Sequence, residues 1–224
     1  MGPKYEFTDE TMNYEGMLLH RIKRLSDGKL GGWIESEENL SQEDNCWIDN
    51  NAKVFDGARV YGNASVYGDA QVYDNAKVFD NAKVFDNVEI SDGAQVSGDA
   101  KVYGNAAIYD CAKIYEDAQV YDNARVGCDA EIYGNAKVYG SAKIFGDAFI
   151  YGDAEVYGNA QVHGNVLVAD NAKVYGNAWV CNTAKVYDHA EVFGEAKVHG
   201  TTQVYGNAKV GDKDQIILNA QICD

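Results

Sequence analysis

Residues 51–79 read NAKVFDGARVYGNASVYGDAQVYDNAKVF, and this stretch decides the fold. A valine recurs at every sixth residue, and an alanine stands two residues before each valine. The same phase runs from Ile48 to Ile222, a span of 174 residues or 29 steps of six, which gives 30 sites. All 30 sites are Val or Ile, and 25 of them have Ala two residues earlier. No insertion shifts the phase, so this part of the chain forms one repeat architecture.

A period of six does not suit an α-helix, whose apolar positions recur every three to four residues. Within each unit, the Ala-x-Val alternation is typical of a strand with one buried face. The two residues that follow are mostly Gly-Asn, Asp-Asn or Gly-Asp, which tolerate the positive φ of a sharp corner. Each hexapeptide therefore predicts a short strand and a corner, and the Ala and Val side chains become buried only when successive coils stack.

The recurring pattern V-x-G-N-A-K, found at 204–209, resembles the hexapeptide signature of left-handed parallel β-helix proteins, the bacterial transferase hexapeptide superfamily. This resemblance implies three hexapeptides per coil. The expected fold is therefore all-β: a left-handed parallel β-helix, which is a triangular solenoid of ten 18-residue coils, with an N-terminal β-hairpin cap. The left hand is implied by the resemblance and not by the periodicity.

The first 45 residues break the register, so we divide the chain into a cap, 1–45, and a solenoid, 46–224. In the cap, KYEFTDET and MLLHRIKRL are expected to form the two strands of a hairpin. The cap would cover strand edges that an open coil exposes. The block GGWIESEENLSQEDNCWI at 31–48 also resembles that of uncharacterised bacterial and phage hexapeptide-repeat proteins.

Two departures mark the ends of the repeat. Ile34 and Leu40 precede the regular repeat and are expected to take buried positions like those of its Val and Ile residues, at irregular spacing. At the other end, Asp214 takes an inward position and Ile217-Leu218 replaces a turn. These residues predict a distorted last coil that offers a surface to a partner.

Composition limits the range of functions. The formal net charge of −16 and the pI near 4.5 argue against nucleic acid or an anionic membrane as a direct ligand. No apolar stretch approaches the length of a membrane helix, and the N-terminal residues lack the apolar run of a signal peptide. Five unevenly spaced cysteines do not indicate a secreted disulfide framework, so we expect a cytoplasmic protein.

The enzymes of the bacterial transferase hexapeptide superfamily, which the repeat resembles, usually have a catalytic histidine, a loop that protrudes between coils and a cleft that binds acyl-CoA. Here the phase never slips, and His20, His163, His189 and His199 have no acidic partner that the sequence identifies. We therefore expect no catalytic residue and no cofactor. An acyl-CoA-dependent acyltransferase stays as an alternative.

Residues 18 apart stack on adjacent coils, and one outward column is aromatic throughout. Its members are Tyr67, Phe85, Tyr103, Tyr121, Tyr139, Tyr157, Tyr175 and Phe193. Such a ladder stabilises neighbouring coils, or it offers a flat aromatic face to protein or carbohydrate. The sequence leaves both interpretations open.

The other outward columns depart from the consensus within a few neighbouring coils. The candidate interface residues there are Phe145, Phe149, Tyr151, His163, Leu167, Trp179 and Cys181. Apolar side chains at normally polar positions indicate a self-association patch, and hence a homo-oligomer. A trimer would follow the family, and a dimer is equally allowed. His163, Cys181 and His199 are zinc-type ligands, but rungs of a flat sheet point in parallel rather than converging, so we expect no metal site.

Acidic residues gather at the corners. One corner is expected to carry a carboxylate on six successive coils, from Asp56, Asp74, Asp92, Asp110, Asp129 and Asp147. Asp suits a corner, but like charges one coil apart repel, which hints at a cation or a basic partner. Cys111 and Cys128 fall at the same corner and could bridge if oxidised, although free thiols are expected in a reducing compartment.

The solenoid carries 25 acids and 14 Lys or Arg (35 minus 10, and 19 minus 5), a net charge of −11. Over ~48 Å this is one charge per ~4 Å, against one per ~1.7 Å in duplex DNA. A DNA mimic that occupies a DNA-binding groove is thus a further alternative. We expect a non-catalytic, acidic β-solenoid that serves as a protein-binding scaffold or inhibitor, directed at a host protein if it derives from a phage.

Overall fold

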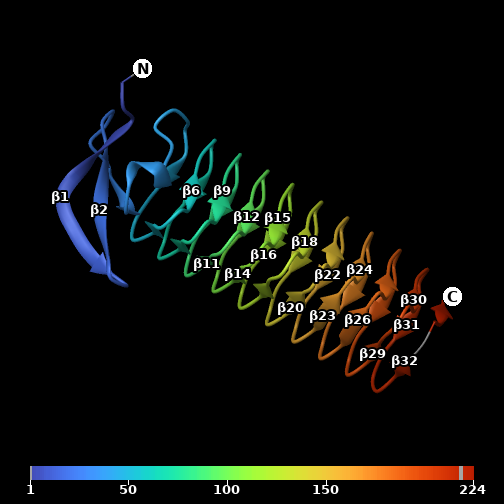
Figure 1. Ribbon diagram of the computed structural model, residues 1–224. Helices are drawn as coiled ribbons and strands as arrows, with labels where there is room; N and C mark the ends of the chain where they lie inside the picture. Colours follow the sequence, from blue (N-terminus) through green and yellow to red (C-terminus); the bar gives the residue numbers. More distant parts are fainter. Residues whose placement is uncertain (1, 217–218) are drawn as a thin grey trace.

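The computed structural model describes residues 2–216 and 219–224. The chain forms an elongated solenoid with an antiparallel hairpin at its N-terminal end (Figure 1). Thirty short strands, β4 to β33, follow one another at six-residue intervals and build ten coils of about 18 residues. This confirms the fold expected from the repeat. The left hand of the coil stays the expectation that the resemblance supplies.

Three parallel sheets make the faces of the solenoid, and we name them sheets A, B and C. The coil strands of sheet A are β5 (Lys53–Val54), β8 (Gln71–Val72), β11 (Glu89–Ile90), β14 (Ala107–Ile108), β17 (Arg125–Val126), β20 (Lys143–Phe145), β23 (Gln161–Gly164), β26 (Trp179–Asn182), β29 (Lys197–Val198) and β32 (Gln215–Ile216). Sheet B contains β6 (Arg59–Val60), β9 (Lys77–Val78), β12 (Gln95–Val96), β15 (Lys113–Ile114), β18 (Glu131–Ile132), β21 (Phe149–Ile150), β24 (Leu167–Val168), β27 (Lys185–Val186), β30 (Gln203–Val204) and β33 (Gln221–Ile222). Sheet C contains β4 (Trp47–Ile48), β7 (Ser65–Val66), β10 (Lys83–Val84), β13 (Lys101–Val102), β16 (Gln119–Val120), β19 (Lys137–Val138), β22 (Glu155–Val156), β25 (Lys173–Val174), β28 (Glu191–Val192) and β31 (Lys209–Val210).

The core is a continuous column of small and β-branched side chains. The Val or Ile of each hexad and the Ala two residues before it are almost all fully buried. Backbone hydrogen bonds join each coil to the next in register, as in Lys137 N–H to Ala154 O (2.9 Å) and Tyr139 N–H to Val156 O (3.0 Å). The strands thus need their backbone donors, which agrees with a single proline in the chain.

The cap extends sheet A beyond the first coil. Strand β1 (Tyr5–Tyr14) pairs antiparallel with β2 (Met17–Arg24), as the sequence predicts. A third strand that sequence reasoning missed, β3 (Leu30–Ile34), pairs antiparallel with β2 and parallel with β5. A Cβ on Gly31 would lie 2.7 Å from Ile22 Cγ1, so the close approach of the hairpin requires glycine there.

Buried groups of the cap close the end of the core. Tyr5 is buried, and its hydroxyl donates to the carbonyl of Leu40 (2.9 Å). Ile34 and Leu40 are fully buried, in agreement with their assignment as forerunners of the repeat. The short 3-10 helix Glu37–Asn39 ends in a buried Asn39, whose side chain donates to the carbonyls of Asp56 and Ala58 (both 2.9 Å).

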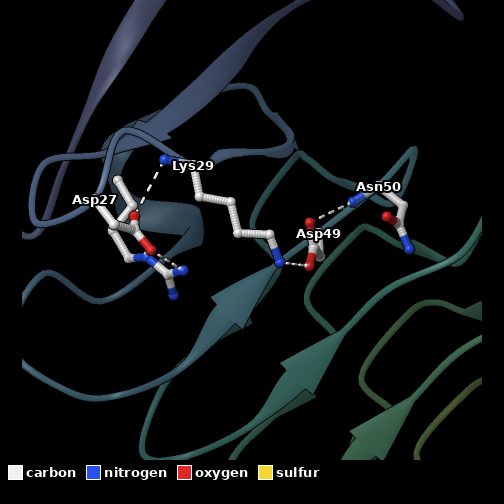
Figure 2. A network of polar contacts seen from close by, with 5 residues as sticks. Asp27, Lys29, Asp49 and Asn50 are labelled. Carbon is white, nitrogen blue, oxygen red and sulfur yellow. Dashed lines mark hydrogen bonds and ion pairs between the residues drawn. The ribbon is translucent and has the colours of Figure 1, made fainter.

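A polar network joins the loop between β2 and β3 to the first coil (Figure 2). Asp27 accepts from the Arg24 guanidinium at 2.9 and 2.7 Å and from the Lys29 N–H at 3.1 Å. The Lys29 ammonium pairs with Asp49, which also accepts from the Asn50 N–H (2.9 Å). The Arg24 side chain holds the pKa of Asp27 down at about 2.

At the C-terminal end, Asp214 is exposed and accepts a hydrogen bond from the Gly211 N–H (3.2 Å). The inward position therefore holds no buried side chain in this coil, and Ile216 and Ile222 are only partly buried. The expected replacement of a turn by Ile217 and Leu218 lies outside the described residues. In the described part of the chain, no helix has the length and apolar character needed to cross a membrane.

Candidate interaction surfaces

The corners take the positive φ that the turn residues predict. Gly140 has φ +70°, and Asp74, Asp92 and Asp110 have φ between 55° and 58°. These carboxylates bind the backbone of the next coil: Asp74, Asp92 and Asp110 accept from the N–H 18 residues later at 3.4, 3.3 and 2.9 Å. Each of these three carboxylates thus has a donor within the fold, so this part of the acidic corner needs no cation or basic partner.

The acidic corner is two adjacent columns and not one. Asp56, Asp74, Asp92 and Asp110 occupy the positive-φ position of their corners. Cys128 takes the same position one coil later, and Asp129 and Asp147 lie at the following position. All six carboxylates belong to the same corner, but they divide between its two positions. The reason is that only the first corner residue has the φ that directs its side chain to the next backbone N–H.

The two corner cysteines fall in these neighbouring columns. The Cys111 N–H donates to the Cys128 carbonyl (3.0 Å), so the two residues lie on consecutive coils. Both thiols are free, with Cys111 exposed and Cys128 half-buried. Neither contributes to a site that the remaining geometry defines.

The aromatic ladder on sheet C is confirmed as one continuous stack. Its seven consecutive ring pairs, from Tyr67 to Phe193, have centroids 4.8–5.4 Å apart and planes within 13° of parallel. Two hydroxyls of the ladder bind side chains 16 residues later: Tyr139 donates to Glu155 and Tyr175 to Glu191, both at 2.9 Å. The ladder rings are half-buried, and two of the six tyrosine hydroxyls are paired within the solenoid. This favours the stabilising interpretation of the ladder over a binding face.

The candidate interface residues flank one corner, at 146–148, where sheets A and B meet. We call Phe145, Phe149, Tyr151, His163, Leu167, Trp179 and Cys181 the platform. The longest strands of the solenoid, β20, β23 and β26, carry its sheet A side, with three or four residues each against two elsewhere. Phe145 pairs with His163 and His163 with Cys181, while Phe149 pairs with Leu167 on sheet B.

The sheet A side of the platform packs on itself. The Trp179 indole lies between the rings of His163 (5.4 Å) and His199 (5.7 Å), and Cys181 Sγ lies 3.2 Å from His199 Nδ1. Burial, and then the charge of His199, lowers the pKa of His163, and burial raises the pKa of the Cys181 thiol. Both shifts favour the uncharged forms of His163 and Cys181. Among the described residues, no three His, Cys, Asp or Glu side chains gather in a way that could hold a metal ion.

The sheet B side of the platform is open. Phe149 is 39% exposed, and Leu167 beside it is half-buried. Tyr133 and Tyr151 stack next to them with centroids 5.0 Å apart. The apolar pair on the sheet B side of the platform is therefore Phe149 and Leu167, whereas Trp179 and Cys181 pack against His163 and His199 on sheet A.

Sequence reasoning missed the apolar surface of the cap. Among the residues that the structure describes, the other large apolar side chains that are exposed are Phe7 (36%), Leu18 (48%), Leu25 (45%) and Leu30 (42%). The alternation in MLLHRIKRL was the available signal, because a strand that buries Leu19 turns its neighbour Leu18 to the opposite face. A second apolar surface therefore lies more than 100 residues away in the sequence from Phe149.

Comparisons with known proteins agree with this architecture. A family described as YdcK Beta solenoid repeat matches residues 58–74 and 148–164. The chain is a β-solenoid repeat protein. Ten chains of solved structures resemble it. One of them is the Francisella novicida UDP-N-acetylglucosamine acyltransferase, with a TM-score of 0.59 and 17% sequence identity over 70% of this chain. The match spans 65% of that enzyme's chain and shows a shared fold. A search of curated proteins gave no match.

Proposed function

We propose that this protein is a non-catalytic, acidic β-solenoid that binds protein through the open side of the platform, and that a second copy of the chain binds there. The observation that supports this most directly is the register pair Phe149 and Leu167. They occupy the first position of β21 and β24, where most coils place Lys, Arg, Gln or Glu. A paired apolar surface at a normally charged position is the composition of an interface core.

The solenoid supports the platform as a rigid base. Each coil is hydrogen-bonded to its neighbours on three sheets, and the platform lies near the middle of the described coils. The pairing of β23 with β26 extends over four residues, from Gln161 to Gly164. A preorganised surface loses little conformational entropy on association.

The proposal is tested by restoring the usual residues. Phe149→Lys and Leu167→Lys place a long polar side chain at outward positions, so the fold should be retained. We expect light scattering over a concentration series to show a dimer or trimer for the wild type and a monomer for both variants. Leu18→Gln, which removes an exposed leucine from the cap, is the matched control and should keep the wild-type mass.

Two results would overturn the proposal. One is a wild-type protein that stays monomeric at every concentration. The other is a loss of mass in Leu18→Gln with no change in Phe149→Lys, because the interface would then lie on the cap. A partner from outside the chain, a host protein if the cap resemblance reflects a phage origin, would compete for the same surface and be lost on the same substitutions.

The acyltransferase alternative draws support from the fold it shares with the Francisella novicida enzyme. It requires acetyl-CoA to bind, and calorimetry with the wild type and His163→Ala tests that directly. A DNA mimic would instead compete with duplex DNA for a DNA-binding protein, with strong salt dependence. A scaffold shows neither behaviour.

A further inference from the structure

Sheet A also carries aromatic residues after its strands, but the series is interrupted at Ser91. Tyr73 stacks on Phe55, with centroids 5.2 Å apart and planes 4° from parallel, which leaves its other face directed toward the coil of Ser91. The next ring, Tyr109, belongs to a coil ~9.6 Å further along the axis, at ~4.8 Å per coil. Ladder rings in this protein lie 4.8–5.4 Å apart. At the level of the backbone, the interruption therefore spans the place of one ring, and Ser91, which stands there, is 8% exposed.

Tyr109 does not close this interruption, because it inclines toward the following coil. A Cβ on Gly127 would lie 2.3 Å from Tyr109 Cε2, so the ring rests on Gly127. Its nearest aromatic partner is Phe145, with centroids 6.1 Å apart. Ser91 and Gly127, two small residues at aromatic positions, thus stand one coil below and one coil above Tyr109 and leave space beneath its ring.

The space widens at Ala107. In the complete ladder, the hydroxyl end of each ring reaches the side chain 16 residues later, as Tyr139 reaches Glu155. For a ring in the coil of Ser91, that residue is Ala107, which replaces a long polar side chain with a methyl group. The result is a hollow of about 350 Å³ between Tyr73, Ser91, Ala107 and Tyr109. This volume falls at the lower end of the range for small-molecule sites.

Opposite charges stand on either side of Ala107. Glu89 pairs in register with Ala107 on one side, and Arg125 pairs with it on the other. Both side chains line the hollow and are exposed. Asp92 also lines it, but its carboxylate already accepts from Ser91 Oγ (2.9 Å) and from the Asp110 N–H (3.3 Å). Within the described part of the chain, neither Glu89 nor Arg125 forms an ion pair. The Glu89 carboxylate and the Arg125 guanidinium are therefore available to a ligand. They lie two coils apart, at the end of the hollow toward which the substituent of a bound ring would project.

We propose that this hollow binds a free aromatic amino acid. The ring takes the place missing between Tyr73 and Tyr109 and stacks as the ladder rings do. Its carboxylate pairs with Arg125 and its ammonium group with Glu89, since the two charges of a zwitterion match the two sides of the hollow. The site lies on sheet A, away from Phe149 and Leu167, and does not depend on the proposed function.

Ligand-observed NMR and calorimetry with four probes separate the parts of this proposal. L-Phenylalanine carries the ring and both charges, phenethylamine lacks the carboxylate, 3-phenylpropionate lacks the ammonium group, and L-leucine lacks the ring. We expect L-phenylalanine to bind, each single-charge analogue to bind about tenfold more weakly, and L-leucine not to bind. Equal binding of L-leucine, or equal binding of all three aromatic probes, would overturn the assignment.

Substitutions provide the second arm. Ser91→Tyr should complete the aromatic series, retain the fold and abolish binding of L-phenylalanine. Arg125→Gln and Glu89→Gln should each weaken it by about tenfold. Ser97→Tyr is the matched control, because it fills an interruption between Phe79 and Tyr115 on sheet B, where the residue 16 positions later is Lys113. Binding that persists in Ser91→Tyr, or that is lost equally in Ser97→Tyr, would contradict the site.

Discussion

At the scale of the residue, the corner is the most demanding position of the repeat. Its first residue has a positive φ in coil after coil, and glycine or aspartate fills most of these places. Glycine avoids the steric conflict, whereas aspartate accepts the conflict and offsets it by binding the next backbone N–H, as Asp122 binds that of Gly140 (3.1 Å). The two residues therefore solve one problem by different means.

Gly140 tests this interpretation. Gly140→Ala introduces a Cβ that would lie 2.9 Å from the Gly158 nitrogen at φ +70°, and we expect it to lower the free energy of unfolding by about 1–2 kcal/mol. Gly140→Asp should lower it less, because its carboxylate can accept from the Gly158 N–H. Equilibrium unfolding in urea measures both. Equal losses in the two variants would show that the carboxylate contributes nothing at the corner.

The buried and corner residues could be predicted from the sequence, and the contacts between coils could not. The phase from Ile48 to Ile222 leaves no choice of inward face, since a shift of one residue would turn every side chain over. The bond from Asp110 to the Cys128 N–H and the inclination of Tyr109 over Gly127 depend on side-chain directions in the folded coil. Residue spacing predicts which residues stack on adjacent coils, but it does not predict the direction in which their side chains incline.

At the scale of the element, the cap shows the same limit. The hairpin strands could be recognised by their alternation, but β3 has two glycines and no alternation, and it becomes a strand through pairing with β2 and β5. For the platform, residue spacing predicted the gathering of Phe145, His163 and Cys181. It did not predict that Trp179 lies packed between two histidines while Phe149 stays open.

The network of the cap predicts a pH dependence. Arg24 lowers the pKa of Asp27 from 3.8 to about 2, so the ionised carboxylate favours the folded cap. Its contribution is complete above pH ~4 and is lost as the pH falls through about 2, because the unfolded chain then binds the proton more readily. Arg24 also lies 5.0 Å from the centre of the Trp47 ring, so tryptophan fluorescence reports on this contact.

We expect the wild type to change its tryptophan fluorescence between pH 4 and pH 2, and Asp27→Asn to lose most of this change. Asp9→Asn, which removes an exposed carboxylate of β1 outside the network, serves as the control and should behave as the wild type. An unaltered acid transition in Asp27→Asn would show that the network does not hold the loop to the first coil.

At the scale of the whole molecule, the protein is a stack of coils with little variation. Stability comes from a continuous core and from three hydrogen-bonded sheets, so single outward side chains are free to vary without loss of fold. Most outward positions follow the consensus. We propose binding at two groups of departures: Ser91, Ala107 and Gly127 on sheet A, and Phe149 and Leu167 on sheet B.

The acidic charge has a structural origin in part. Asp74, Asp92 and Asp110 use their carboxylates to hold the next coil. The net charge of −16 thus follows partly from the way the corners are built, and it does not by itself require a basic partner.

Site-specific photo-crosslinking tests the central claim most directly. A benzoylphenylalanine in place of Phe149 would lie on the open side of the platform, and the same group in place of Tyr121 would lie on the ladder of sheet C. We predict that light converts the purified protein to a covalent dimer or trimer when the group is at 149 and leaves it monomeric when the group is at 121. Equal yields at the two positions, or no crosslinked product at 149, would contradict the proposal that the platform binds a second copy of the chain.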